Sequence, residues 1–243
     1  MSAPQNSTVI LVHGAWADGS CWKKVIVPLQ RHGLKVICAP VPLTSLSADV
    51  AALTRTLERT SGPVILVGHA YGGALIGATR EDRVKALVYI AALAPDAGET
   101  VAKVFYRDEP HPNAPKLSPD GHGFIWMPEA GFQEAVAHNA SADQTTVMAA
   151  VQRPIAVQCI QEPATAQAWK AKPSWFLIAE ADRMINPKTQ HFMADRMGAS
   201  LRSEHVDHSP MLTAPDLVID LIIEAARATF PPLAALAGRT ANM

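Results

Sequence analysis

Apolar runs that alternate with amphipathic stretches set the pattern of this chain. Runs typical of buried β-strands cover residues 8–12, 34–39, 64–67, 84–91, 174–179 and 199–206. Apolar side chains at helical spacing fall within residues 20–32, 45–60, 186–197 and 214–230. This alternation predicts an α/β fold with a sheet of about six, mostly parallel strands and helices on both faces.

The alternation stops between residues 96 and 173. Prolines crowd the first half of this segment, at positions 110, 112, 115, 119 and 128. Residues 130–138 and 141–151 have the composition of helices, and the segment carries no strand signal. We expect a mostly helical cap over one end of the sheet, inserted into an α/β core formed by residues 1–95 and 174–243.

One stretch joins a strand to a helix through a cluster of glycines. The apolar run 64–67 is followed by Gly68, His69, Ala70, Tyr71, Gly72 and Gly73, and helical spacing resumes behind them. This is the context of a nucleophile elbow of pattern G-x-S-x-G, in which glycines let strand and helix backbones approach closely. The central position holds Ala70, whose methyl group cannot attack a carbonyl. The alternative interpretation is an ordinary strand-to-helix turn.

Three further special turns follow predicted strands. His13-Gly14-Ala15 comes after the first strand, Asp182 after residues 174–179 and His208 after residues 199–206. Ligands of open parallel sheets bind outside the carboxyl ends of the strands, so we expect these turns to meet there. The order Ala70, Asp182, His208 is the order nucleophile, acid, histidine of an α/β-hydrolase triad.

The acid and the histidine have rivals. Asp182 competes with Glu180, Asp195 and Asp207, and we favour it because it lies in the turn just beyond its strand. His208 competes with His205, which we expect to face away from the site. The other histidines weighed are interpreted as loop-organising, elbow, surface or cap residues rather than metal ligands: His13, His69, His111, His122, His138 and His191. No H-E-x-x-H motif or paired Cys/His spacing predicts a metal site.

The chain resembles the α/β-hydrolase superfamily over nearly its whole length. Residues 13–22, 64–73 and 207–211 look like the corresponding motifs of small esterases related to plant methylesterases and hydroxynitrile lyases. The resemblance implies that His208 is the general base and that Asp182 orients it. It also implies an oxyanion hole formed by the backbone N–H groups of Ala15 and Tyr71. The alanine at position 70 departs from the family pattern.

Aromatic side chains are the candidates for contact with a substrate. We expect Trp16, Phe124 and Trp126 to bind it. Within the cap, Phe105, Tyr106 and Trp169 are further candidates for a pocket lining, although each aromatic residue there is also compatible with simple packing.

Composition narrows the class of partner. The 243 residues are 49% hydrophobic and carry a formal net charge of -1, which argues against nucleic acid. No run approaches the length of a membrane span, and the N-terminus lacks the pattern of a signal peptide. Cys21, Cys38 and Cys159 form no C-x-x-C pair, which fits reduced thiols in a cytoplasm. We expect a small-molecule substrate and no cofactor; a homodimer is left open.

Three functions fit the sequence. The first is an ester or lactone hydrolase whose serine is replaced by alanine. The second is a non-hydrolytic lyase or decarboxylase that uses His208 and the oxyanion hole. Enzymes such as methylketone synthase resemble this chain in lacking the elbow serine. The third is a small-ligand binding protein. Cys21, Cys159 and Ser209 are disfavoured as substitute nucleophiles, because the first lies at a helix start, the second in the cap and the third beside the histidine.

Overall fold

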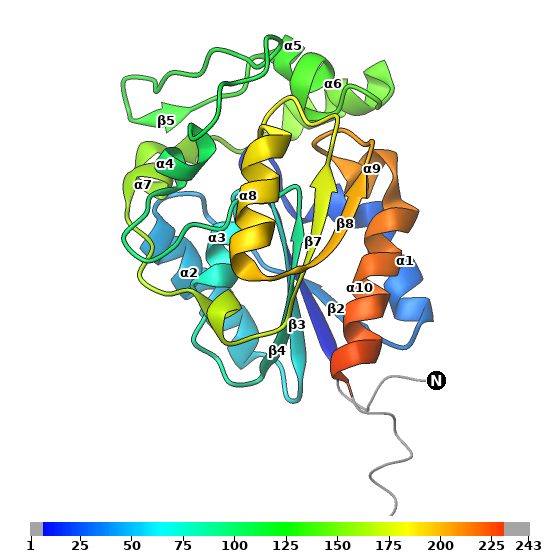
Figure 1. Cartoon of the computed structure of the whole chain (residues 1–243). Helices are drawn as coiled ribbons and strands as arrows, with labels where there is room; N and C mark the ends of the chain where they lie inside the picture. The colour runs from blue at the N-terminus through cyan, green and yellow to red at the C-terminus, as the bar shows by residue number, and fades with distance from the viewer. Residues whose placement is uncertain (1–6, 231–243) are drawn as a thin grey trace, which may run out of the picture.

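The computed structural model describes residues 7–230. Residues 1–6, where no signal peptide is expected, and residues 231–243 lie outside that range. A six-stranded sheet forms the centre of the molecule, in the order β2-β1-β3-β4-β7-β8, and all its pairs are parallel (Figure 1). Its strands are β1 (Thr8–Val12), β2 (Lys35–Cys38), β3 (Val64–His69), β4 (Val84–Ile90), β7 (Ser174–Ala179) and β8 (Ser200–Glu204). The predicted sheet is confirmed.

Helices cover both faces of the sheet, because successive side chains of each strand point to opposite sides. Ile10 and Val12 of β1 belong to one apolar cluster, and Val9 and Leu11 belong to another. The first cluster takes in the helices α2 (Leu46–Glu58), α3 (Gly72–Gly77) and α8 (Pro187–Met197). The second takes in α1 (Lys23–Arg31), the short α9 (Pro210–Thr213) and α10 (Pro215–Thr229).

The helix expected over residues 20–32 is divided. A 3-10 helix, η1 (Gly19–Trp22), comes first, and α1 begins directly behind it. The carboxylate of Asp18 accepts the N–H of Ser20 at 2.8 Å and so caps the tighter turn. The last strand is also shorter than expected, because the Val206 N–H turns back to the carbonyl of Glu204.

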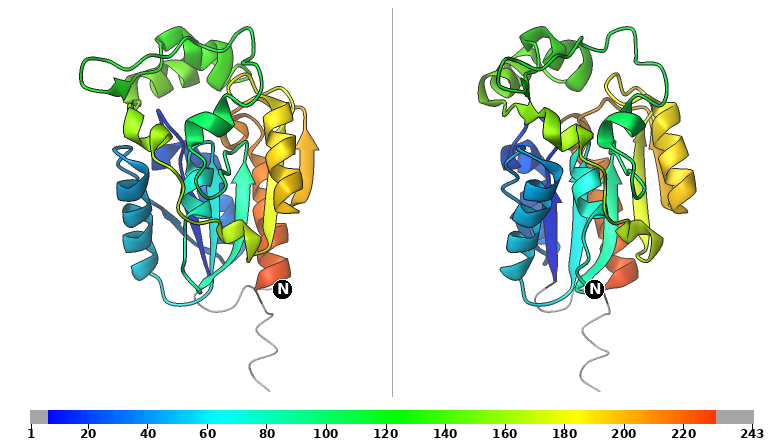
Figure 2. Two further views of the ribbon diagram at one scale, coloured as in Figure 1. Left: turned by 60° about the vertical axis from the view of Figure 1, so that its left-hand side comes forward. Right: turned by 90° about the vertical axis from the view of Figure 1, so that its left-hand side faces the viewer.

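Residues 96–173, which we call the cap segment, lie largely over the carboxyl ends of the strands (Figures 1 and 2). The segment contains α4 (Val101–Phe105), β5 (Phe124–Ile125), α5 (Glu129–Gly131), the π-helical turn η2 (Phe132–Val136), α6 (Ala142–Val151), β6 (Ile155–Ala156), α7 (Val157–Gln161) and η3 (Ala168–Lys170). The segment also holds two short strands that the sequence pattern does not signal, β5 and β6, which pair antiparallel. Two residues per strand are too few to produce a period in the sequence.

The cap segment is fastened to the loop that follows β1. The Trp16 N–H donates to the carbonyl of Arg153 at 3.1 Å, and the Trp16 indole N–H donates to the carbonyl of Ile125 at 2.9 Å. A further bond joins the Ala156 N–H to the carbonyl of Leu43 at 3.0 Å. The small sheet of the cap segment is therefore fastened to the loops that follow β1 and β2.

Close backbone approach defines the turn between β3 and α3. A Cβ atom added to Gly68 would lie 2.6 Å from the carbonyl oxygen of Gly72. One added to Gly72 would lie 2.5 Å from the carbonyl oxygen of Val12, on the neighbouring strand. Only glycine leaves room for these three backbones to pack together.

We expect Gly68→Ala to destabilise the fold by about 1–3 kcal/mol, because the new methyl group meets backbone that cannot move aside. Urea denaturation with an unchanged m-value would measure the loss. Gly121→Ala is the matched control, since a Cβ there meets nothing within 4 Å. Equal stability of the two variants would contradict the close packing at the elbow.

Candidate active site

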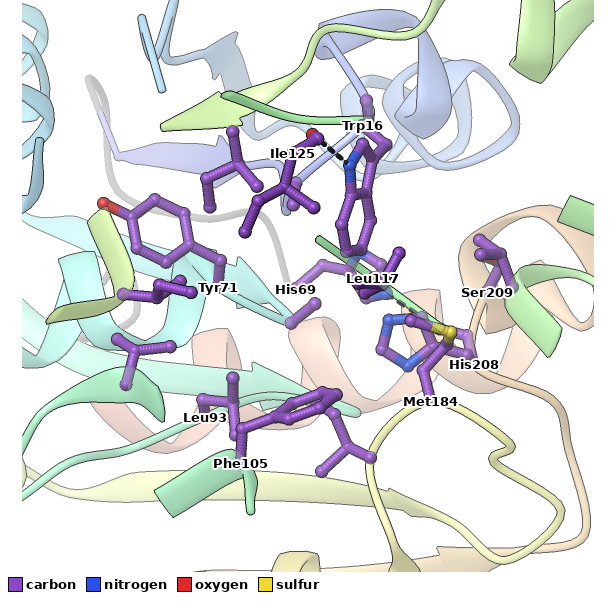
Figure 3. Close-up of a pocket in the computed structure, with 18 of the residues that line it drawn as sticks. Trp16, His69, Tyr71, Leu93, Phe105, Leu117, Ile125, Met184, His208 and Ser209 are labelled. Carbon is purple, nitrogen blue, oxygen red and sulfur yellow. Dashed lines mark hydrogen bonds between the residues drawn. The ribbon is translucent and has the colours of Figure 1, made fainter. Parts of the chain in front are cut away.

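Four loops meet at the carboxyl edge of the sheet. They follow β1, β3, β7 and β8 and carry, in that order, Ala15, Ala70, Asp182 and His208. A pocket between this edge and the cap segment is lined by Ala15, Ala70 and His208, together with Trp16 and Tyr71 (Figure 3). The nucleophile position, the acid and the histidine, which are far apart in the sequence, thus lie together at one site.

Ala70 has the backbone of an elbow. Its φ of 48° lies in the left-handed region, which is uncommon for a residue with a side chain. Its carbonyl accepts the N–H of Gly73 at 3.1 Å and that of Leu93 at 3.0 Å, which fixes the turn from both sides. A Cβ on Gly14 would lie only 2.8 Å from the Cβ of Ala70, so the loop after β1 rests against the methyl group. A strained turn tied into the site favours the elbow over an ordinary turn.

The imidazole of His208 is held by Asp182. Its Nδ1–H donates to Oδ2 of Asp182 at 2.8 Å, and both side chains are buried. Oδ2 also accepts from the amide of Gln190, and Oδ1 accepts the N–H groups of Met184 and Ile185 at 2.7 and 2.9 Å. Four donors therefore fix the carboxylate, and the carboxylate fixes the tautomer of His208, which leaves Nε2 for proton transfer.

The rival acids are engaged elsewhere. Glu180 pairs with an imidazole on α8, and Asp195 is exposed. Asp207 is fully buried and accepts the N–H of Asn139 in the cap segment at 2.9 Å. Of these acids, only Asp182 bonds to the catalytic candidate His208 within residues 7–230. The rival histidine at position 205 is exposed, as expected.

Two backbone N–H groups are open to a ligand. In the part of the chain that the structure describes, neither Ala15 nor Tyr71 donates its N–H to a protein acceptor. The N–H of Trp16, next along the chain, is already used by the carbonyl of Arg153. Both open groups belong to residues that line the pocket beside Ala70, where the resemblance places an oxyanion hole.

Two buried histidines support the site from behind. The Nε2–H of His69 donates to the carbonyl of His208 at 2.7 Å, and the two rings lie 4.7 Å apart. The Nδ1–H of His13 donates to the carbonyl of Gly14 at 2.9 Å. Burial lowers the pKa of His13, and that of His69 well below the usual value, so both rings stay neutral.

Sequence reasoning missed His69 and Gln190 as parts of the site. His69 orients the main chain of the catalytic candidate, and Gln190, on α8, braces Asp182. The only sequence signal for Gln190 is a polar residue on the apolar side of an amphipathic helix. That signal could not be used, because the side of the helix that faces the core is known only from the fold, where Gln190 is fully buried.

Only one of the three residues expected to bind substrate lines the pocket. Trp16 does. Phe124 instead packs against the first apolar cluster. Trp126, just after β5, is 50% exposed, and its indole N–H donates to Asp120 at 3.2 Å. Neither Phe124 nor Trp126 lines this pocket, whereas Ile125 between them does, because successive side chains of β5 point to opposite sides. Phe105 and Tyr106, weighed as alternatives, do line it.

The thiols near the site are poor nucleophiles. Cys21 lines the pocket, but burial raises the pKa of its thiol well above the usual value. Burial also raises the pKa of Cys159 to about 12. A protonated thiol does not attack a carbonyl readily, so neither residue replaces a serine at position 70.

The pocket is apolar. None of the described residues that line it is Lys, Arg, Asp or Glu. Residues 7–230 hold no cluster of three or more His, Cys, Asp or Glu side chains suited to a metal ion. No helix in that range has the length and apolar character for a membrane span. The arrangement suits a small apolar molecule with a carbonyl group.

Comparison with known proteins agrees with this geometry. The sequence pattern of the Alpha/beta hydrolase family matches residues 9–221. Alpha/beta hydrolase nvfD of Aspergillus novofumigatus is 27% identical over 245 residues, which cover 90% of this chain and 96% of that protein. Methylesterase 8 of Arabidopsis thaliana is 23% identical over 247 residues, which cover 89% of this chain and 88% of that protein.

A solved structure shares the fold. A variant of tomato methylketone synthase I, complexed with β-ketoheptanoate, superposes with a TM-score of 0.79 at 15% identity, over 92% of this chain and 98% of the tomato chain. The family pattern spans most of the described sheet and both loops that carry the acid and the histidine. The chain therefore belongs to the Alpha/beta hydrolase family and is related to the plant methylesterases.

Proposed function

We propose that the protein converts a small, mainly apolar carbonyl compound by acid–base catalysis at His208, without a covalent intermediate. The observation that carries this proposal is the fully braced Asp182–His208 pair facing two open N–H groups around the methyl group of Ala70. In this proposal the base, its orienting acid and the oxyanion donors act without a serine.

The oxyanion hole supplies the electrostatic part of catalysis. A substrate carbonyl oxygen placed between the N–H groups of Ala15 and Tyr71 gains negative charge in the transition state, and the two donors stabilise it. Such a donor contributes roughly 3–4 kcal/mol in other enzymes. An enolate is stabilised in the same way as a tetrahedral oxyanion, so the hole serves reactions that form no acyl-enzyme.

A β-keto acid is the substrate class that fits best. The carbon–carbon bond to the carboxylate breaks, carbon dioxide leaves, and the electron pair forms an enolate whose oxygen lies in the oxyanion hole. The protonated His208 then donates its Nε2 proton to carbon and regains one from water. No lysine or arginine lines the pocket to bind the carboxylate, and poor solvation of that charge favours its loss as neutral carbon dioxide.

The tomato relative supports this substrate class. Its structure holds β-ketoheptanoate within a fold that matches 92% of this chain. Asp182 would stabilise the imidazolium of His208 before its proton is donated and again after it is regained.

The second candidate is an ester or lactone hydrolase site that lacks only its serine. Two observations favour it: the esterase-type relatives, and the left-handed backbone of Ala70, which presents a side chain to the pocket as an elbow serine would be presented. In that case the chain binds an ester and turns it over only when the nucleophile is restored. A third candidate, a binding protein without chemistry, has no use for the braced acid and histidine.

We expect the protein to release 2-hexanone from 3-oxoheptanoate, and His208→Ala to lower that rate by about 10²–10⁴-fold. Gas chromatography of the ketone, corrected for spontaneous decarboxylation, measures the turnover. His205→Ala is the matched control, because this exposed histidine lies three positions away and makes no contact with Asp182. Ketone release equal to the spontaneous rate in the unmodified protein would refute the decarboxylase proposal.

Ala70→Ser is expected to be labelled by a fluorophosphonate and to hydrolyse p-nitrophenyl butyrate with an initial burst, because its hydroxyl would join an intact acid, base and oxyanion hole. Mass spectrometry and stopped-flow absorbance report the two events. The double variant Ala70→Ser/His208→Ala serves as control and should show neither. If the folded serine variant stays unlabelled, the oxyanion hole is wrongly assigned.

A further inference from the structure

A buried polar cluster lies beside the elbow, away from the catalytic pair. It joins Asp49 of α2, Tyr71 of the elbow and Cys159 of α7 in the cap segment. The hydroxyl of Tyr71 donates to Oδ2 of Asp49 at 2.8 Å, and the thiol of Cys159 donates to the same oxygen at 3.5 Å. The mechanism proposed above uses none of these three side chains.

Asp49 is an unusual residue for its position. It is fully buried in a helix whose other inward side chains are mostly apolar, and no cation bonds to it among the described residues. Its donors are two neutral side chains and the N–H of Thr44 at 3.3 Å. A buried acid without an ion pair costs stability relative to an apolar side chain that would pack there. The cluster therefore calls for a role other than packing.

Tyr71 links the cluster to the oxyanion hole. Its ring points away from His208, as Figure 3 shows, and its hydroxyl is bound by Asp49. Its backbone N–H is one of the two open donors beside Ala70. Gly72 and Gly73 follow and have no side chains, and Ala70 has only a methyl group. Among residues 70–73, Tyr71 alone therefore has a side chain that hydrogen-bonds.

The cap segment takes part through Cys159. The residues around that cysteine, Ile155 and Ile160, line the pocket, so the position of α7 shapes the substrate cavity. Since Tyr71 and Cys159 bond to the same oxygen of Asp49, a shift of α7 changes the bonding of the carboxylate that holds Tyr71.

We infer that Asp49 is a positioning residue. It couples the position of α7 in the cap segment to the direction of the Tyr71 N–H. The inference rests on the proposed function only in that the oxyanion hole is used. Asp49 does not line the pocket; it acts through the tyrosine.

Selective ¹⁵N-tyrosine labelling tests the coupling in the protein that keeps Ala70, without a nucleophile or a substrate. The chain holds 3 tyrosines, and Tyr71→Phe assigns the Tyr71 amide by its disappearance. We expect Asp49→Asn and Cys159→Ala to shift or broaden that amide while those of Tyr89 and Tyr106 stay in place. Thr56→Val is the matched control, because this buried hydroxyl of α2 bonds only within its own helix. An unchanged Tyr71 amide in folded Asp49→Asn overturns the inference.

A kinetic arm separates positioning from mere structural support. In an Ala70→Ser background, Asp49→Asn should lower the limiting rate of fluorophosphonate labelling about tenfold, a fraction of the 10²–10³-fold lost when an oxyanion donor is removed. The concentration for half-maximal rate should stay constant, and Cys159→Ser, which keeps a donor, should label faster than Cys159→Ala. A lower melting temperature with an unchanged limiting rate would show a structural role only and sink the proposal.

These outcomes stay distinct from those of the proposed function. Labelling of Ala70→Ser reads the oxyanion hole directly and requires no natural substrate, so failure to release a ketone leaves this inference intact. If Ala70→Ser is folded but unlabelled, the oxyanion hole is absent and the inference falls with it.

Discussion

The site depends on the close approach of three backbones at the turn after β3. Gly68 and Gly72 let β3, α3 and the end of β1 come within the distances that a single methyl group would forbid. This contact sets the loop after β1 against Ala70. Ala15 and Tyr71, whose N–H groups have no protein acceptor within residues 7–230, both line the pocket there. The oxyanion hole proposed for this site depends on that contact, whereas the histidine and the acid arrive from the other half of the sheet.

The second constraint is electrostatic. Asp182 is surrounded by four donors, so it needs no rearrangement when an imidazolium forms beside it. The surrounding pocket is apolar, and a low local dielectric strengthens both this pair and any bond to the proposed oxyanion hole. Two neutral, buried histidines hold the loops without adding a competing charge. Preorganised polar groups within an apolar cavity are therefore the physical basis of the proposed catalysis without a nucleophile.

Much of this was predictable from the sequence. Long apolar runs such as residues 84–91 identified the strands, and the rule that parallel strands end at one edge brought Ala70, Asp182 and His208 together. The two-residue strands β5 and β6 were missed because they are held by pairing with each other rather than by a periodic pattern. Phe124 and Trp126 were misplaced for the same reason, since the direction of a ring on so short a strand follows from the fold. Partners from distant elements, such as Gln190 on α8, have no local signal at all.

The left-handed backbone of Ala70 has one more consequence. A side chain there stores strain of order 1–3 kcal/mol, which an elbow normally exchanges for reactivity. With alanine, the strain remains while no side-chain nucleophile benefits from it. Replacement by glycine would relax that backbone. The strength of selection against this variant would measure the contribution of the methyl group, which fills the space beside the proposed oxyanion hole.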